Sequence, residues 1–151
     1  MKKTDKTAMI AIIFIILTSI VYAAGTQDEA KALVKSAIAY SKVNGMSKTL
    51  EEINNPKGQF TKGDLYIFAY DMHGYCVAHG FSKKLIGAHL FNMKDPDGKL
   101  YVQERIEIAK TKGSGWQDYK FTNPTTNKIE NKTAYIEKVG DIILGSGVYK
   151  Q

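Results

Sequence analysis

The sequence has 151 residues, of which 44% are hydrophobic and 24% are charged, and its formal net charge is +6. These values are typical of one globular domain with a single core, so they exclude a disordered chain and a repeat array. The lysines are spread along the chain and Arg105 is the only arginine. This pattern argues against a nucleic-acid-binding face, which needs clustered basic residues. Cys76 is the only cysteine, which excludes an internal disulfide.

The first 23 residues have the pattern of an export signal. Three lysines precede an apolar run at residues 10–17, and Val21 and Ala23 occupy the positions expected just before a cleavage site. We therefore expect a signal peptide at 1–23, a mature domain at 24–151 and a periplasmic location. The alternative is an uncleaved inner-membrane anchor that faces the periplasm, because the apolar stretch is about as long as the shortest spanning helices, roughly 17 residues.

Helical spacing is clearest directly after this segment. Thr26 and Glu29 form a capping-box pattern, and apolar residues then recur at helical intervals until Gly45. A shorter helix is expected to start at Ser47 and to end at the "NNPKG" segment, residues 54–58. A third helix is expected over residues 101–112, because Val102, Ile106 and Ala109 share one face and Gly113 ends the pattern.

Strand-forming segments fill the remainder of the chain. Residues 65–79 predict a hairpin with its turn near His73 and Gly74, and the "DPDG" segment at 95–98 predicts a second turn. Three further strands are expected at 115–121, 133–139 and 142–149, joined by short links that favour antiparallel pairing. The expected fold is α+β, with a long N-terminal helix packed on a five-stranded antiparallel sheet and helices on its flanks.

Five segments in register resemble a known family: "FTKGDLYIFAYDMHGYCVAHG" (60–80), "LIGAHLFNMKDPDGK" (85–99), "GSGWQDYKFTNP" (113–124), "NKTAY" (131–135) and "ILGSGVY" (143–149). Together they resemble the single Cache domain family, type 2, an extracytoplasmic relative of the PAS fold. The resemblance implies a concave sheet face that holds a small organic acid and reports to a chemoreceptor, kinase or cyclase. Only Lys150 and Gln151 follow Tyr149, so we expect output through a separate membrane receptor or kinase in trans.

A carboxylate in a mostly apolar pocket needs a cation or several hydrogen-bond donors. Lys132 is the strongest candidate, because it matches a lysine of the family motif that precedes the tyrosine at Tyr135. His79 could add a donor. The full set of candidate ligand-binding residues is Tyr66, Phe68, His79, Trp116, Tyr119, Phe121, Lys132 and Tyr135. For each aromatic residue the alternative is core packing, for Lys132 an exposed strand-edge position, and for His79 a hydrogen-bonded place in the core.

Strand alternation tests this set. It places Tyr119 and Phe121 on one face and Trp116 on the other, unless Trp116 precedes regular pairing. It also groups Tyr66, Phe68 and Tyr70 on one face of the first strand, and Tyr75, Val77 and His79 on one face of the second. These two sets are candidate pocket walls.

Catalysis, metal binding and cofactor binding find no support in the pattern of residues. The three histidines lack the helical spacing of a zinc site, "DPDG" lacks the downstream ligands of a calcium loop, and Cys76 is expected to be a buried, inert thiol. Two hypotheses remain, neither of them enzymatic. The chain is either a sensing module for a two- to four-carbon carboxylate or an envelope interaction protein without a ligand; a homodimer through the N-terminal helix is a candidate assembly.

Overall fold

The computed structural model describes residues 24–150. The signal peptide or anchor expected at 1–23 lies outside the described residues. Among the helices of the described part, none has the length and apolar character needed to cross a bilayer.

Two helices begin the domain. Helix α1 (Gln27–Asn44) starts at the predicted capping box, in which the Glu29 amide donates to the Thr26 hydroxyl and the Thr26 amide donates to the Glu29 carboxylate. Helix α2 (Met46–Ile53) follows after Gly45. Gly45 has a φ of 84°, which glycine adopts without strain, so the chain turns sharply between the two helices.

The predicted hairpin at 65–79 is split into two parts. Strand β2 (Leu65–Tyr66) pairs with β1 (Thr61–Lys62), whereas β3 (Phe68–Asp71) pairs with β4 (Cys76–His79). Between β2 and β3, Ile67 forms backbone hydrogen bonds with Phe60 and Gly80 instead of with a neighbouring strand.

A β-bulge interrupts the pairing of β3 with β4. Ala69 pairs with Ala78 but Tyr70 pairs with Cys76, so Val77 has no partner opposite it. The expectation that Tyr75, Val77 and His79 share one face is therefore wrong. His79 faces the aromatic side chains of Tyr66 and Phe68, whereas Val77 packs on the other side of the sheet. Alternation predicts faces only where a strand is regular.

The segment between β4 and the next helix is irregular, apart from the short 3-10 helix η1 (Lys83–Leu85), and leads into α3 (Tyr101–Thr111). Asp95 fixes the turn before α3. Its carboxylate accepts hydrogen bonds from the backbone amides of Asp97 and Lys99 and from that of Lys120, which lies in the strand β5 (Ser114–Thr122). The "DPDG" segment is thus a turn held against the sheet.

Three long strands complete the chain: β5 (Ser114–Thr122), β6 (Ile129–Val139) and β7 (Ile142–Tyr149). The main sheet has five strands in the order β4-β3-β7-β6-β5, with antiparallel pairing throughout. The five-stranded antiparallel sheet predicted from the sequence is confirmed.

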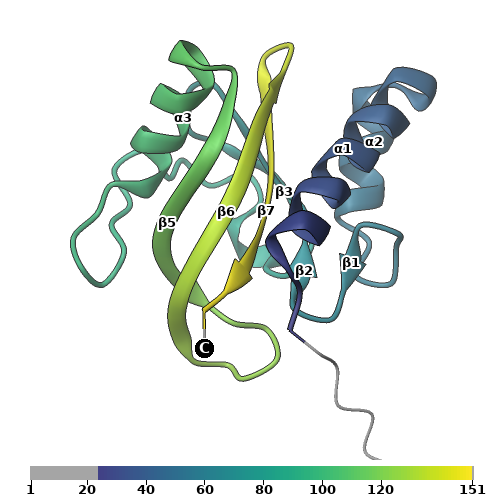
Figure 1. Cartoon of the computed structure of the whole chain (residues 1–151). Coiled ribbons are helices and arrows are strands. Elements are labelled where there is room, and N and C mark those ends of the chain that lie inside the picture. The colour runs from purple at the N-terminus through teal and green to yellow at the C-terminus, as the bar shows by residue number, and fades with distance from the viewer. Residues whose placement is uncertain (1–23, 151) are drawn as a thin grey trace, which may run out of the picture.

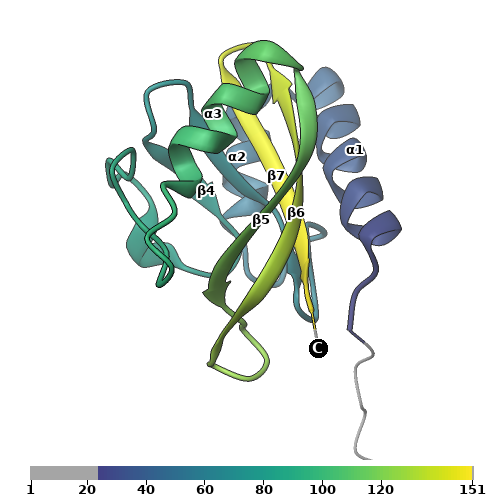
Figure 2. The same cartoon turned by 60° about the vertical axis from the view of Figure 1, so that its left-hand side comes forward.

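The sheet forms the middle layer of the domain. Helices α1 and α2 pack on one face and α3 packs on the other, as the two views show (Figures 1 and 2). One apolar cluster lies between the sheet and α1, around Val34, Ile67 and Leu144. The other lies between the sheet and α3 and contains most of the buried aromatic side chains. The candidate site belongs to this second cluster.

Candidate functional site

Aromatic side chains surround a small polar centre on the α3 face of the sheet. They come from four strands of the main sheet, from β2 and from the start of α3. Their rings are mostly 5–6.5 Å apart, the usual spacing of packed aromatic pairs. We call this set the aromatic cluster; it consists of Tyr66, Phe68, Tyr70, His79, Tyr101, Tyr119, Phe121 and Tyr149.

Lys132 of β6 extends into the aromatic cluster. Strand alternation places Lys132, Ala134 and Ile136 on the α3 face, and the lysine side chain is only 1% exposed. Its Nζ lies 3.9 Å from the ring centroid of Tyr66 and 4.6 Å from that of Tyr149, and it donates a hydrogen bond of 3.3 Å to the Tyr149 hydroxyl. Cation–π contacts of this kind stabilise a desolvated ammonium group, but they do not neutralise its charge.

Arg105 of α3 supplies a second buried cation. Its side chain is 1% exposed, and its guanidinium carbon lies 4.3 Å from the ring centroid of Phe68 and 4.7 Å from that of Tyr70. Nε donates to the Gln117 side-chain oxygen at 3.2 Å, and the Gln117 amide in turn donates to the Tyr101 carbonyl. Within residues 24–150, Nη2 of Arg105 and the Tyr101 hydroxyl are buried without a hydrogen-bond partner.

The charges in the aromatic cluster are unbalanced. Among the ion pairs formed by the described residues, none includes Lys132 or Arg105. Burial lowers the pKa of Lys132 well below its usual value, and the positive charge of Arg105 lowers it further, with Asp64 opposing. Burial, with help from the same two cations, lowers the pKa of His79 to about 3. The cluster therefore disfavours any further positive charge and favours an anion.

His79 is held in one orientation by backbone groups. Its Nδ1 accepts the amides of Phe81 at 3.2 Å and Ser82 at 2.9 Å, and its own backbone amide donates to the Asn54 side chain. Because Nδ1 is an acceptor and the ring is neutral at pH 7, the proton is on Nε2. The ring packs against Tyr66 and Phe121, with centroid distances of 5.1 and 5.9 Å, so His79 presents a neutral N–H donor within the aromatic cluster.

The structure brings together six of the eight candidate ligand-binding residues and separates two. The six on the α3 face are Tyr66, Phe68, His79, Tyr119, Phe121 and Lys132. Trp116 and Tyr135 pair across β5 and β6 on the face toward α1, with their rings 5.4 Å apart. Tyr135 lies three residues from Lys132 and Trp116 three from Tyr119, and in a regular strand an odd separation reverses the face.

On their own face, these two residues make contacts unrelated to the aromatic cluster. The Tyr135 hydroxyl donates to Glu137 at 2.8 Å and its ring lies 5.4 Å from the Lys31 amine, while Trp116 is 39% exposed.

Arg105, Tyr101 and Tyr149 were absent from the predicted set. The signal for Arg105 was present in the helix spacing, because Val102, Arg105, Ile106 and Ala109 follow the i, i+3, i+4, i+7 pattern of one helix face. A charged residue at a core-facing position of a helix is unusual enough to indicate a functional role. Tyr149 shares a strand pair with Lys132, which only the register of β6 and β7 reveals.

Metal binding and thiol chemistry are the alternatives to ligand binding in this region. The described part of the chain contains no group of three or more histidine, cysteine or carboxylate side chains arranged to hold a metal ion. Cys76 is fully buried, and burial raises the pKa of its thiol to about 11, which makes the nucleophilic thiolate rare at neutral pH.

The family model described as Single Cache domain 2 matches residues 3–151 of this chain. The sensor histidine kinase MctS of Rhizobium johnstonii is 32% identical over 88 residues, which cover 57% of this chain and 19% of the kinase. The match thus spans about a fifth of that relative's length.

Two solved structures are similar over most of the domain. A methyl-accepting chemotaxis protein from Vibrio parahaemolyticus has a TM-score of 0.70 and 27% identity, with 81% of this chain and 86% of that chain covered. A Cache chemosensory domain, described as showing the structural basis for carboxylic acid recognition, has a TM-score of 0.65 and 26% identity, with 82% and 88% covered.

Proposed function

This chain belongs to the Single Cache domain 2 family, and from this premise we propose that it is an extracytoplasmic sensor module whose ligand is a small carboxylate. It is homologous to the ligand-binding domains of periplasmic chemoreceptors. The proposed site is the aromatic cluster, with Lys132 and Arg105 as the groups that neutralise the ligand. We propose binding and not catalysis as the function of these residues.

The observation that carries the proposal is the pair of buried cations without an ion-pair partner among residues 24–150. An unpaired buried charge is costly, and two that lie against the same ring, Phe68, are more so. A bound anion removes this cost, whereas a neutral ligand does not. The aromatic cluster is thus built for a negatively charged ligand.

A carboxylate fits the available donors. Its two oxygens accept about four hydrogen bonds. The cluster offers the Lys132 amine, and it offers Nη2 of Arg105 and the Tyr101 hydroxyl, which have no hydrogen-bond partner within residues 24–150. The Nε2–H of His79 is a further donor. The rings around these groups suit a short hydrocarbon chain. The similar Cache domain with a carboxylic acid ligand supports the same choice, and we propose a two- to four-carbon acid.

The location and the partner are part of the proposal. We propose that residues 1–23 act as an export signal or anchor and that the domain lies in the periplasm. The histidine kinase and chemoreceptor relatives support a membrane receptor or kinase as the protein that reads the bound state. We propose that this partner is a separate protein.

Calorimetric titration of the purified protein with acetate, propionate, pyruvate and succinate tests the proposal. At least one of these acids is expected to bind. Truncating one member of a buried charge pair costs about 2 kcal/mol or more, so Arg105→Gln is expected to weaken binding by at least about 30-fold. Lys110→Gln is the matched control, since Lys110 is an exposed residue of the same helix. Equal binding by wild type and a folded Arg105→Gln variant, or no binding by wild type, would reject the proposal.

A further inference from the structure

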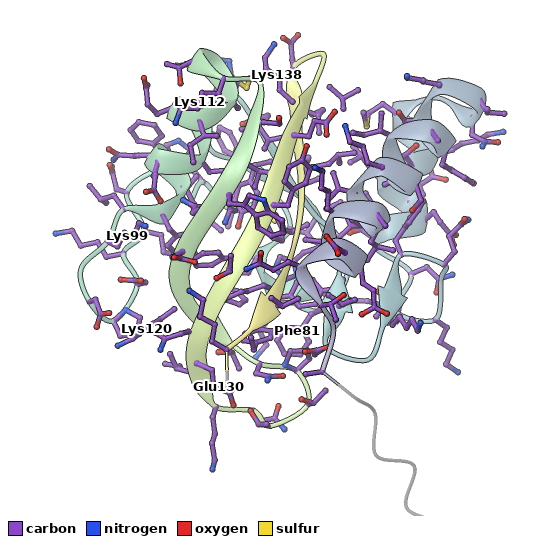
Figure 3. The ribbon with its side chains drawn as sticks, in the orientation of Figure 1. Phe81, Lys99, Lys112, Lys120, Glu130 and Lys138 are labelled. Atoms are coloured by element: carbon purple, nitrogen blue, oxygen red, sulfur yellow. The ribbon has the colours of Figure 1, made fainter. Side chains whose placement is uncertain are left out.

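An apolar groove lies directly outside the aromatic cluster. It has a volume of about 350 Å³ and is formed by the turn before α3, the first residue of α3 and the ends of β5 and β6. Its apolar walls are Met93, Pro96, Tyr101, Phe121 and Ile129. Met93 is 39% exposed and Ile129 59% exposed, so the groove opens to solvent. In Figure 3, Lys120 and Glu130 mark the side of the molecule on which these strand ends lie.

Phe121 belongs both to the groove and to the aromatic cluster. Its ring centroid lies 5.8 Å from Nζ of Lys132 and 5.9 Å from the ring of His79, and the same side chain lines the groove. Four rings surround the Lys132 amine: those of Tyr66, Phe68, Phe121 and Tyr149. Tyr66, Phe68 and Tyr149 are at most 5% exposed, whereas Phe121 is only partly buried. Of the four rings around the Lys132 amine, only that of Phe121 also lines the groove.

We propose that Phe121 determines the length of carboxylate that the site accepts, by closing the ligand site on the side of the groove. This inference rests on the proposed function, because it assumes that the carboxylate lies against Lys132. A hydrocarbon chain that extends from this position toward the surface meets the Phe121 ring. Short acids fit in front of the ring, and longer acids require the ring to be displaced, at a cost in packing that offsets the burial of their extra methylenes.

The groove determines which acids are expected to bind when the Phe121 ring is removed. Phe121→Ala joins the ligand site to an apolar space whose remaining walls are Met93, Pro96, Tyr101 and Ile129. The methylenes of a longer acid then leave water for an apolar surface. Each buried methylene contributes about a fourfold gain in affinity. The variant is therefore expected to prefer acids of five or six carbons, whereas wild type prefers acids of four carbons or fewer.

The experiment is a calorimetric titration of the purified protein with the unbranched acids from acetate to hexanoate. Wild type, Phe121→Ala, Phe121→Leu and Ile129→Ala are compared, with thermal unfolding as the test of folding. Phe121→Leu keeps more of the wall and is expected to shift the preferred length less than Phe121→Ala does. If Phe121→Ala does not fold, Phe121→Leu provides the same comparison with wild type. Ile129→Ala alters the outer end of the groove alone and is expected to keep the wild-type preference.

Four outcomes are informative. A longer preferred acid in Phe121→Ala, with an unchanged preference in Ile129→Ala, supports the inference. An unchanged preference in a folded Phe121 variant overturns it but leaves the proposed function intact, since short acids still bind. A folded Phe121 variant that binds no acid of any length also overturns it, because Phe121 then holds the ligand and does not limit its length. A wild type that binds none of the acids overturns the proposed function as well.

Discussion

Replacing Lys132 by methionine is expected to make the ligand-free protein more stable while abolishing carboxylate binding. Methionine keeps the length and the apolar stem of lysine but removes an amine whose protonated form is disfavoured by burial and has no ion-pair partner among the described residues. The change sacrifices the cation–π contacts with Tyr66 and Tyr149 and one hydrogen bond. Replacing buried charges by apolar groups of similar volume typically stabilises by up to about 4 kcal/mol, so we expect a gain of about 1–4 kcal/mol at pH 7.

The pH dependence of this gain identifies its cause. The pKa of Lys132 is lowered in the folded protein, by burial and by Arg105, so the unfolded chain binds more protons in the window between the lowered pKa and the ordinary value of about 10.4. The free energy of unfolding of wild type therefore rises as the pH rises through that window, because the cost of burying Lys132 becomes smaller. The advantage of Lys132→Met over wild type is expected to be smaller at pH 9 than at pH 7.

Urea unfolding at both pH values, with and without acetate, measures these quantities. Lys138→Met is the matched control, because Lys138 lies on the same strand but is exposed, and we expect it to change stability by no more than about 0.5 kcal/mol (Figure 3). Acetate at a hundred times its dissociation constant is expected to stabilise wild type by about 2.7 kcal/mol and Lys132→Met by nothing measurable. A Lys132→Met protein that is less stable than wild type at pH 7, or that acetate still stabilises, would refute the reasoning.

Two further predictions concern protonation and the turn before α3. Carboxylate binding is expected to be accompanied by uptake of a proton at Lys132, because the anion raises the pKa that burial lowers. Calorimetry in two buffers of different ionisation enthalpy detects this uptake. Affinity is expected to fall by up to about tenfold per pH unit above the pKa that Lys132 has in the ligand-free protein. Asp95→Ala is expected to cost about 1–3 kcal/mol, measured by urea unfolding at pH 7. Burial alone would raise the pKa of Asp95, but the hydrogen bonds from three backbone amides lower it. The stabilisation by Asp95 is therefore present above its ordinary pKa and is lost as the pH falls through the lowered value. Equal unfolding curves for Asp95→Ala and wild type at pH 7 would contradict this prediction.

The sequence predicted the architecture well because its signals are local. The capping box at Thr26, the helical spacing of α1 and α3 and the run of strand-forming segments at the end of the chain each depend on neighbouring residues alone. The separation of β2 from β3 at Ile67 could not be predicted from neighbouring residues. It results from hydrogen bonds with Phe60 and Gly80, whose proximity to Ile67 depends on how the chain folds back.

The candidate site was predicted in part for the same reason. Alternation along β5 correctly separated Trp116 from Tyr119, because that strand pairs regularly with β6 along its whole length. Alternation failed on β4, where the bulge at Val77 changes the face of the residues beyond it. Arg105 reaches the aromatic cluster from a helix on the far side of that cluster, and only the packing of α3 against β5 reveals that it lies near Lys132.

The carboxylate of Asp95 also determines how the domain behaves beside copies of itself. β5 is the outermost strand of the sheet, and an edge of this kind is a template on which a second chain can add a strand. Asp95 occupies the outward amide of Lys120, and the Lys99 amine donates to the neighbouring outward carbonyl of Asp118. An approaching strand would have to displace both groups before it could pair there. The turn before α3 therefore covers this part of the sheet edge and disfavours strand pairing between two copies of the domain.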